Sequence, residues 1–114
     1  MTLPPRKPKK AKAETRWRSQ AHLGFVRNHC CSVCHDGTAI EAAHVRLGSG
    51  AGMGQKPHDW RAVSLCKACH TRQHTVGEAT FWKQAGQDVE TLIDAFCQTS
   101  PKAAEIKRIR QEAA

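Results

Sequence analysis

The chain has 114 residues, of which 39% are apolar, and its formal net charge is +8 with a pI near 9.5. This length fits one small domain, whose modest core favours a staple such as a bound metal ion. No stretch approaches the ~20 apolar residues that cross a membrane, and residues 1–12 lack the apolar segment of a signal peptide, so we expect a cytoplasmic protein without a membrane partner. The positive charge predicts a polyanionic partner, with nucleic acid as the first candidate.

The chain divides into three regions by composition. Residues 1–15 are rich in proline and lysine and predict a disordered basic tail, with a merely solubilising extension as the alternative. Residues 16–99 hold the cysteine and histidine motifs and form the predicted domain. Residues 100–114 predict a basic C-terminal helix or tail.

Hydrophobic periodicity and glycine positions predict the elements of the domain. In chain order these are a helix within residues 16–27, a Cys-x-x-Cys turn leading to a strand at about 40–45, a loop at 48–59, a strand at 60–65, and helices at 69–76, 78–85, 87–98 and after Pro101. Four glycines and one proline identify the loop. Short strands mixed with helices predict an α+β fold.

Two Cys-x-x-Cys pairs, Cys31 with Cys34 and Cys66 with Cys69, share one spacing. Where thiols stay reduced, such pairs are typical of metal ligands rather than disulfides. Each pair presents two thiolates from a tight turn, and two pairs complete the tetrahedral shell of a structural Zn²⁺. We therefore predict a four-cysteine zinc site. Cys30 could replace Cys31, and buried free cysteines are the alternative interpretation.

Three histidines, His44, His70 and His74, are candidates for a second site. His70 follows Cys69 directly, and His74 lies one helical turn later, so both rings project from one helical face and can bind one metal. A finger of two cysteines and two histidines fits poorly because Cys69 and His70 are adjacent. Ordinary surface histidines are the alternative. His44 could be a buried core residue, but the cysteine pairs, the glycine loop and the histidine pair around it together indicate a catalytic layout.

The sequence resembles the HNH endonucleases of the ββα-metal class in four stretches. These are Cys31-x-x-Cys34, "EAAHV" (41–45), "GSGAGMGQKPHDW" (48–60) and "LCKACHTRQH" (65–74). More narrowly, residues 20–98 are similar to small phage- and prophage-type HNH proteins, many of them described as nucleases or recombination-associated proteins. The resemblance implies two strands and a helix around one catalytic divalent metal (Mg²⁺, Mn²⁺, Ni²⁺ or Zn²⁺), beside the four-cysteine zinc site and flanking helices. It also implies hydrolysis of DNA phosphodiester bonds by a monomer or homodimer.

The same resemblance assigns roles to individual residues. His44 corresponds to the general base that takes a proton from water, while His70 and His74 correspond to ligands of the catalytic metal. Asp59 stands near the family's middle Asn and is expected to orient His44 or to join the metal shell, with His58 as its rival. Ala43 departs from the family, which often has Asp or His before the base.

The loop and its basic neighbours are expected to meet DNA. Small residues let a phosphate backbone approach closely, and Arg46, Lys56 and Arg61 flank the loop as expected phosphate contacts. A merely flexible surface loop is the alternative. For the whole protein, the alternatives to a nuclease are a non-catalytic zinc module that binds DNA or protein, and a recombination-accessory protein that holds branched DNA.

Overall fold

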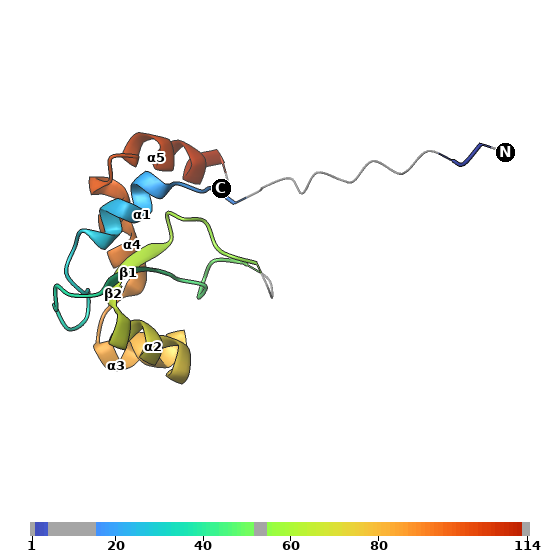
Figure 1. The fold of residues 1–114 in the computed structure, drawn as a ribbon. Coiled ribbons are helices and arrows are strands. Elements are labelled where there is room, and N and C mark those ends of the chain that lie inside the picture. The colour runs from blue at the N-terminus through green and yellow to red at the C-terminus, as the bar shows by residue number, and fades with distance from the viewer. Residues whose placement is uncertain (1, 5–15, 52–54, 113–114) are drawn as a thin grey trace.

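The computed structural model describes residues 2–4, 16–51 and 55–112. Its elements, in chain order, are helix α1 (Gln20–Arg27), strands β1 (Ile40–His44) and β2 (Ala62–Cys66), and helices α2 (Lys67–Val76), α3 (Glu78–Ala85), α4 (Val89–Thr99) and α5 (Ala103–Glu112). Figure 1 shows this mixed α+β fold, which agrees with the predicted class and element order. The predicted disordered tail falls mostly on residues outside the described ranges, as does part of the loop.

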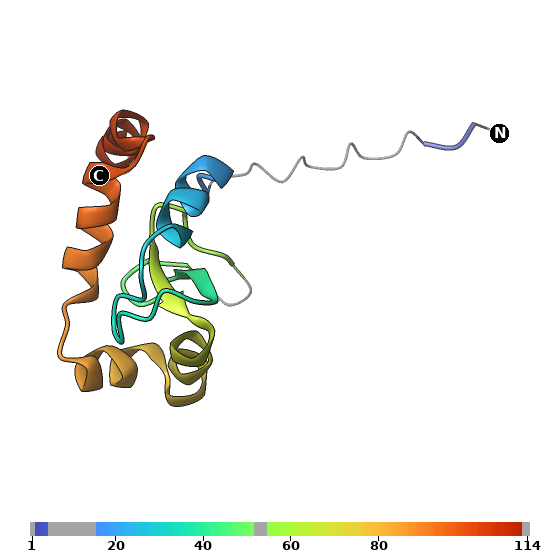
Figure 2. The same cartoon turned by 60° about the vertical axis from the view of Figure 1, so that its left-hand side comes forward.

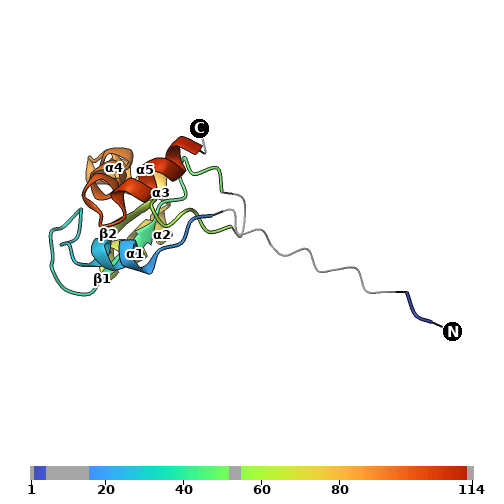
Figure 3. The same ribbon diagram turned by 90° about the horizontal axis from the view of Figure 1, so that it is seen from above.

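The two strands form an antiparallel sheet at the centre of the domain. Glu41 lies opposite Leu65, and His44 lies opposite Ala62. All five residues of β2 are buried, whereas in β1 only Ala43 is buried and Glu41 is exposed. Figure 2 shows α4 and α5 along one side of the sheet, with α2 and α3 packed at one end of it. Helix α1 packs against α4 through Phe25 and Phe96, whose ring centroids lie 6.4 Å apart, and Figure 3 shows the arrangement from above.

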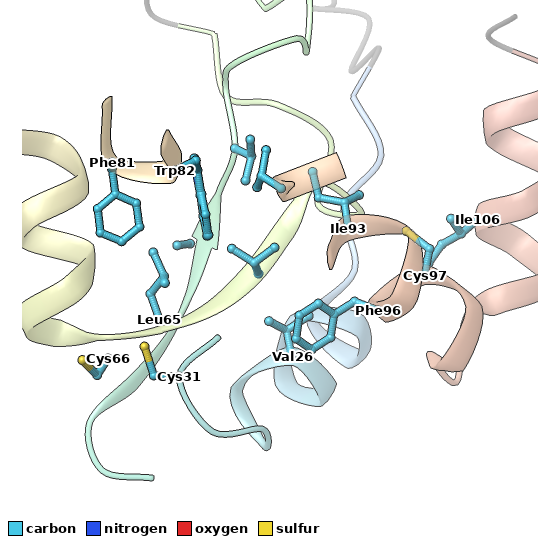
Figure 4. Packing of buried hydrophobic residues seen from close by; sticks show 14 residues of the cluster. Val26, Cys31, Leu65, Cys66, Phe81, Trp82, Ile93, Phe96, Cys97 and Ile106 are labelled. Carbon is cyan, nitrogen blue, oxygen red and sulfur yellow. The ribbon is translucent and has the colours of Figure 1, made fainter. Parts of the chain in front are cut away.

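The hydrophobic core joins the sheet to the helices. Figure 4 shows Leu65 of β2 beside Phe81 and Trp82 of α3, while Val26 of α1 meets Phe96 of α4. The core extends outward in two directions: to Ile106 of α5, which is 1% exposed, and to the sulfurs of Cys31 and Cys66. The cysteine pairs are therefore attached to the core and are not a separate appendage.

Side-chain caps explain where the elements begin. The Ser19 hydroxyl accepts the His22 backbone N–H, so α1 starts at residue 20. The Cys66 thiol accepts the Cys69 backbone N–H, so α2 starts directly after β2, two residues before the predicted start at residue 69. The strand predicted at 60–65 lies at 62–66 because residues 59–61 make the turn that precedes it.

The C-terminal helix predicted after Pro101 is present as α5. Glu105 accepts a hydrogen bond from Trp17 Nε1 at 3.0 Å, and Arg110 pairs with Asp94 of α4 at 2.9 Å. Arg110 also lies over the Trp60 ring, 4.6 Å from its centroid. These contacts hold α5 against α4, the segment before α1 and the turn before β2. Within the described part of the chain, every helix is too short or too polar to cross a bilayer.

Candidate metal and catalytic sites

The four cysteines of the two Cys-x-x-Cys pairs come together at one edge of the core. One ligand atom from each of Cys31, Cys34, Cys66 and Cys69 lies within 4.8 Å of the other three. The Cys34 and Cys66 sulfurs are 3.6 Å apart, close to the ~3.8 Å expected for two thiolates about 2.3 Å from one tetrahedral Zn²⁺. The predicted cluster is therefore confirmed, and these residues can hold a structural metal such as zinc. Cys30 is exposed and stands outside the cluster.

The electrostatics of the cluster favour a cation. Burial raises the pKa of the Cys31 thiol, but hydrogen bonds from the backbone N–H groups of Cys34, Cys66 and Val33 outweigh it and lower this pKa to about 6. Burial and the neighbouring thiols raise the pKa of Cys69 well above its usual range. Four adjacent thiols cannot all ionise against mutual repulsion, whereas a divalent cation makes complete deprotonation favourable.

A second site is formed by His44, the last residue of β1, and Asp59, in the turn before β2. His44 Nε2 lies 2.8 Å from Asp59 Oδ1, and the Asp59 side chain is only 2% exposed. The Ser19 backbone N–H donates to Asp59 Oδ2 at 2.8 Å, and the Asp59 N–H donates to the Trp17 carbonyl at 2.9 Å. Arg18 Nη1 lies 3.4 Å from Oδ1. The segment before α1 thus holds the carboxylate against the histidine.

Burial and the Asp59 contact together set the protonation and the tautomer of His44. Burial lowers the pKa of the His44 imidazole, with Asp59 acting in the opposite direction, so the ring is neutral at pH 7. A carboxylate only accepts hydrogen bonds, so the ring donates through Nε2 and keeps its lone pair at Nδ1. Of the two roles expected for Asp59, the geometry supports the orientation of His44. His58, its rival, instead accepts the Trp17 N–H and stacks on Trp60.

The third group lies on α2 and β1. His70 Nδ1 is 2.9 Å from Glu41 Oε1, and His70 Nε2 is 3.2 Å from His74 Nε2. The predicted pairing of His70 with His74 on one helical face is therefore present. Sequence reasoning missed Glu41, whose only signal was its place in "EAAHV", three residues before His44.

The structure does not gather all the predicted metal ligands. In residues 2–4, 16–51 and 55–112, the four cysteines are the only set of three or more Cys, His, Asp or Glu with converging ligand atoms. His44 pairs with Asp59 near the end of β1, whereas His70 pairs with Glu41 near its start. Ala43 is fully buried, so core packing fills the position where a further ligand could have stood.

Among the predicted phosphate contacts, Arg61 requires a correction. Its side chain is 6% exposed and donates to the Val45 carbonyl at 3.2 Å, to the Leu47 carbonyl at 2.7 Å and to Glu90 at 2.5 Å. Arg61 therefore holds the segment between β1 and the loop in place and is not available to DNA. Arg46 and Lys56 are exposed, and their contact with phosphate stays a prediction.

Comparison with known proteins identifies the family. Residues 4–101 match the family described as "Protein of unknown function (DUF968)", and the chain belongs to it. The chain is also 30% identical, over 97 residues, to the Escherichia coli (strain K12) protein named "Uncharacterized protein YdfU". That alignment covers 82% of this chain but 27% of the relative, so the chain spans about a quarter of the relative's length. No solved structure matches the chain.

Proposed function

We propose that this protein is a metal-dependent HNH endonuclease of the ββα-metal class that hydrolyses phosphodiester bonds in DNA. The observation that carries the proposal is the contact between His44 and the buried Asp59, because a buried carboxylate that fixes one nitrogen of a neutral imidazole leaves the other as a base. The order β1, β2, α2 and the histidine pair on α2 support the same assignment.

The direction of α2 supports a shared site. Near the start of this helix, His70 contacts Glu41 of β1. Just beyond its end, Glu78 accepts the backbone N–H groups of Arg46 and Leu47 at 2.9 and 3.2 Å, past the end of β1. The helix and the strand therefore run side by side in the same direction. The His70–His74 pair lies along the strand that ends in His44.

In the proposed mechanism, His44 Nδ1 takes a proton from a water molecule, which then attacks the scissile phosphate. Asp59 keeps the ring in the tautomer that this step needs and stabilises the imidazolium that forms, since their contact is buried and 2.8 Å long. A divalent metal at His70 and His74 would supply charge stabilisation for the phosphate and the leaving oxygen. Arg46 and Lys56 would position the DNA through its phosphates.

The test is a nicking assay on supercoiled plasmid with Mg²⁺, Mn²⁺, Ni²⁺ or Zn²⁺ added separately. We expect nicking with at least one ion, its loss in His44→Ala, and an unchanged zinc content in that variant. His35→Asn is the matched control: His35 is exposed with φ 64°, a conformation that Asn tolerates. Equal nicking by His44→Ala and the wild type would reject His44 as the base. Repeating the assay on duplex, single-stranded, nicked and branched DNA would define the substrate.

A second candidate function is a zinc module, or a recombination-accessory module, that binds DNA without cutting it. The buried Ala43 favours this candidate, because it leaves the helical histidine pair without a further ligand at that position of β1. Such a module would bind DNA with a steep salt dependence, and its binding would survive His44→Ala and His70→Ala. DNA binding without nicking in any of the ions would support this function over the nuclease.

A further inference from the structure

We infer that Glu41 is a positioning residue that orients His70, so that His70 Nε2 and His74 Nε2 form a two-imidazole metal clamp. The inference rests on the proposed function, whose catalytic metal this clamp would hold. It concerns a residue that the sequence pattern did not single out and that has its own contact, 2.9 Å from His70 Nδ1.

The two nitrogens of His70 make different contacts. Nδ1 faces the Glu41 carboxylate, and Nε2 faces His74. Because a carboxylate accepts, neutral His70 donates through Nδ1 and directs the lone pair of Nε2 toward His74. Histidines that bind metals commonly donate their other ring N–H to a carboxylate, which fixes the tautomer and makes the ligand more basic.

The spacing of the two Nε2 atoms fits a shared ion. They lie 3.2 Å apart, and their ring centroids are 4.9 Å apart. Two imidazole nitrogens, each ~2.0–2.1 Å from one metal, stand about 3.0–3.4 Å apart in octahedral or tetrahedral geometry. The separation of the two nitrogens therefore already matches that of two ligands of one ion, once any proton between the rings is lost.

The strand places Glu41 where a negative charge is useful. Side chains two residues apart share one face of a strand, so Glu41 lies on the same face of β1 as Ala43. Ala43 provides no ligand, and two neutral imidazoles bring no charge of their own. Glu41 supplies a negative charge beside the cation while leaving further coordination positions for water or phosphate oxygen.

A purely structural role explains the Glu41–His70 contact less well. The Glu41 side chain is 48% exposed and that of His70 is 24% exposed. Ion pairs with this degree of exposure contribute ~0–1 kcal/mol to stability. By contrast, removal of the group that accepts the other ring N–H of a ligating histidine lowers metal affinity by about 10- to 100-fold.

The test is calorimetric titration of the zinc-loaded 114-residue chain with Ni²⁺, followed by measurement of the zinc that remains bound. We expect Glu41→Ala to raise the Ni²⁺ Kd about 10- to 100-fold with little change in melting temperature. We expect a smaller rise for Glu41→Gln, whose amide oxygen can still accept the Nδ1–H. Glu112→Ala, which removes an exposed carboxylate at the end of α5, is the matched control and should bind Ni²⁺ like the wild type.

The outcomes separate this inference from the proposed nuclease. If His70→Ala weakens Ni²⁺ binding while Glu41→Ala binds like the wild type, Glu41 is not a positioning residue. If both variants bind Ni²⁺ like the wild type, the clamp does not exist and the inference fails. If both weaken binding but the wild-type protein cuts no DNA, the inference holds and the proposed nuclease activity fails.

Discussion

Replacement of Asp59 by Asn tests the His44–Asp59 pair with almost no change in shape. In the Asp59→Asn variant, the side-chain oxygen can still accept the Ser19 N–H, which donates to Asp59 Oδ2 at 2.8 Å in the native protein. The new amide nitrogen then faces His44 Nε2, where the native carboxylate oxygen lies 2.8 Å away. An amide N–H donates, so His44 Nε2 must accept and the ring proton moves to Nδ1. The lone pair that we propose as the base is thereby turned toward the introduced amide.

The expected size of the effect follows from the loss of this base. General-base catalysis contributes roughly 10²- to 10⁴-fold to a rate. At about 1.36 kcal/mol per tenfold change, Asp59→Asn should raise the activation barrier by about 2.7–5.4 kcal/mol. The carboxylate is only 2% exposed, so its hydrogen bonds are desolvated, and the fold should lose about 1–3 kcal/mol of unfolding free energy. That loss is small enough for the variant to remain folded.

Two measurements check this prediction. The initial rate of plasmid nicking should fall by at least about 10²-fold in Asp59→Asn. The ¹⁵N chemical shifts of the His44 ring should move from the Nε2–H to the Nδ1–H tautomer. Asp88→Asn is the control, because Asp88 caps α4 and Asn caps a helix equally well. A folded Asp59→Asn protein with the native tautomer and native rate would refute the reasoning.

Three further predictions concern the zinc cluster, the loop and pH. Chelation of the metal or Cys34→Ser should remove about one zinc per chain and unfold the domain, because structural zinc contributes ~10–16 kcal/mol, as much as the whole stability of a domain; unchanged circular dichroism after chelation would contradict this. Arg61→Met should destabilise the fold by about 1–3 kcal/mol in urea unfolding, since it leaves the Val45 and Leu47 carbonyls without the guanidinium that donates to them, yet keep the salt dependence of DNA binding, whereas Lys56→Gln should reduce that slope by about one. Burial lowers the pKa of His44, so kcat/KM should stay level through pH ~6.5 and fall only below it as His44 becomes protonated; a fall that begins above pH ~6.5 would show that this pKa is not lowered.

The element order and the cysteine cluster could be predicted because both depend on the spacing of residues that are close in the sequence. Val89, Ile93 and Phe96 repeat at helical intervals, and all three are buried in α4. The two Cys-x-x-Cys turns each present a pair of thiols, so only their meeting remained to be shown. The exact start of α2 could not be predicted, because it depends on a thiol of β2 that caps the helix.

The partners of the candidate catalytic residues depend on contacts between distant parts of the chain. Asp59 reaches His44 because residues 17–19, far away in sequence, hold the turn that carries it. Glu41 is an exposed acidic residue in a short strand, and only the packing of α2 beside β1 reveals its contact with His70. Arg61 was assigned to DNA because a basic residue beside a glycine loop gives no sign that Glu90 and two carbonyls bury it.

The zinc cluster and the histidine pair share helix α2, so the placement of the histidine pair depends on the zinc cluster. Cys66 closes β2, belongs to the cluster and caps α2, so the metal would fix the point from which α2 starts. His70, one turn into this helix, must face Glu41 of β1. Ala43 is fully buried, and a larger side chain there would overpack the core at a cost of about 1–3 kcal/mol. The core thus leaves no room for a ligand at residue 43, and a metal at this site must be held by the helix, with Glu41 as the only acidic group that β1 brings to it.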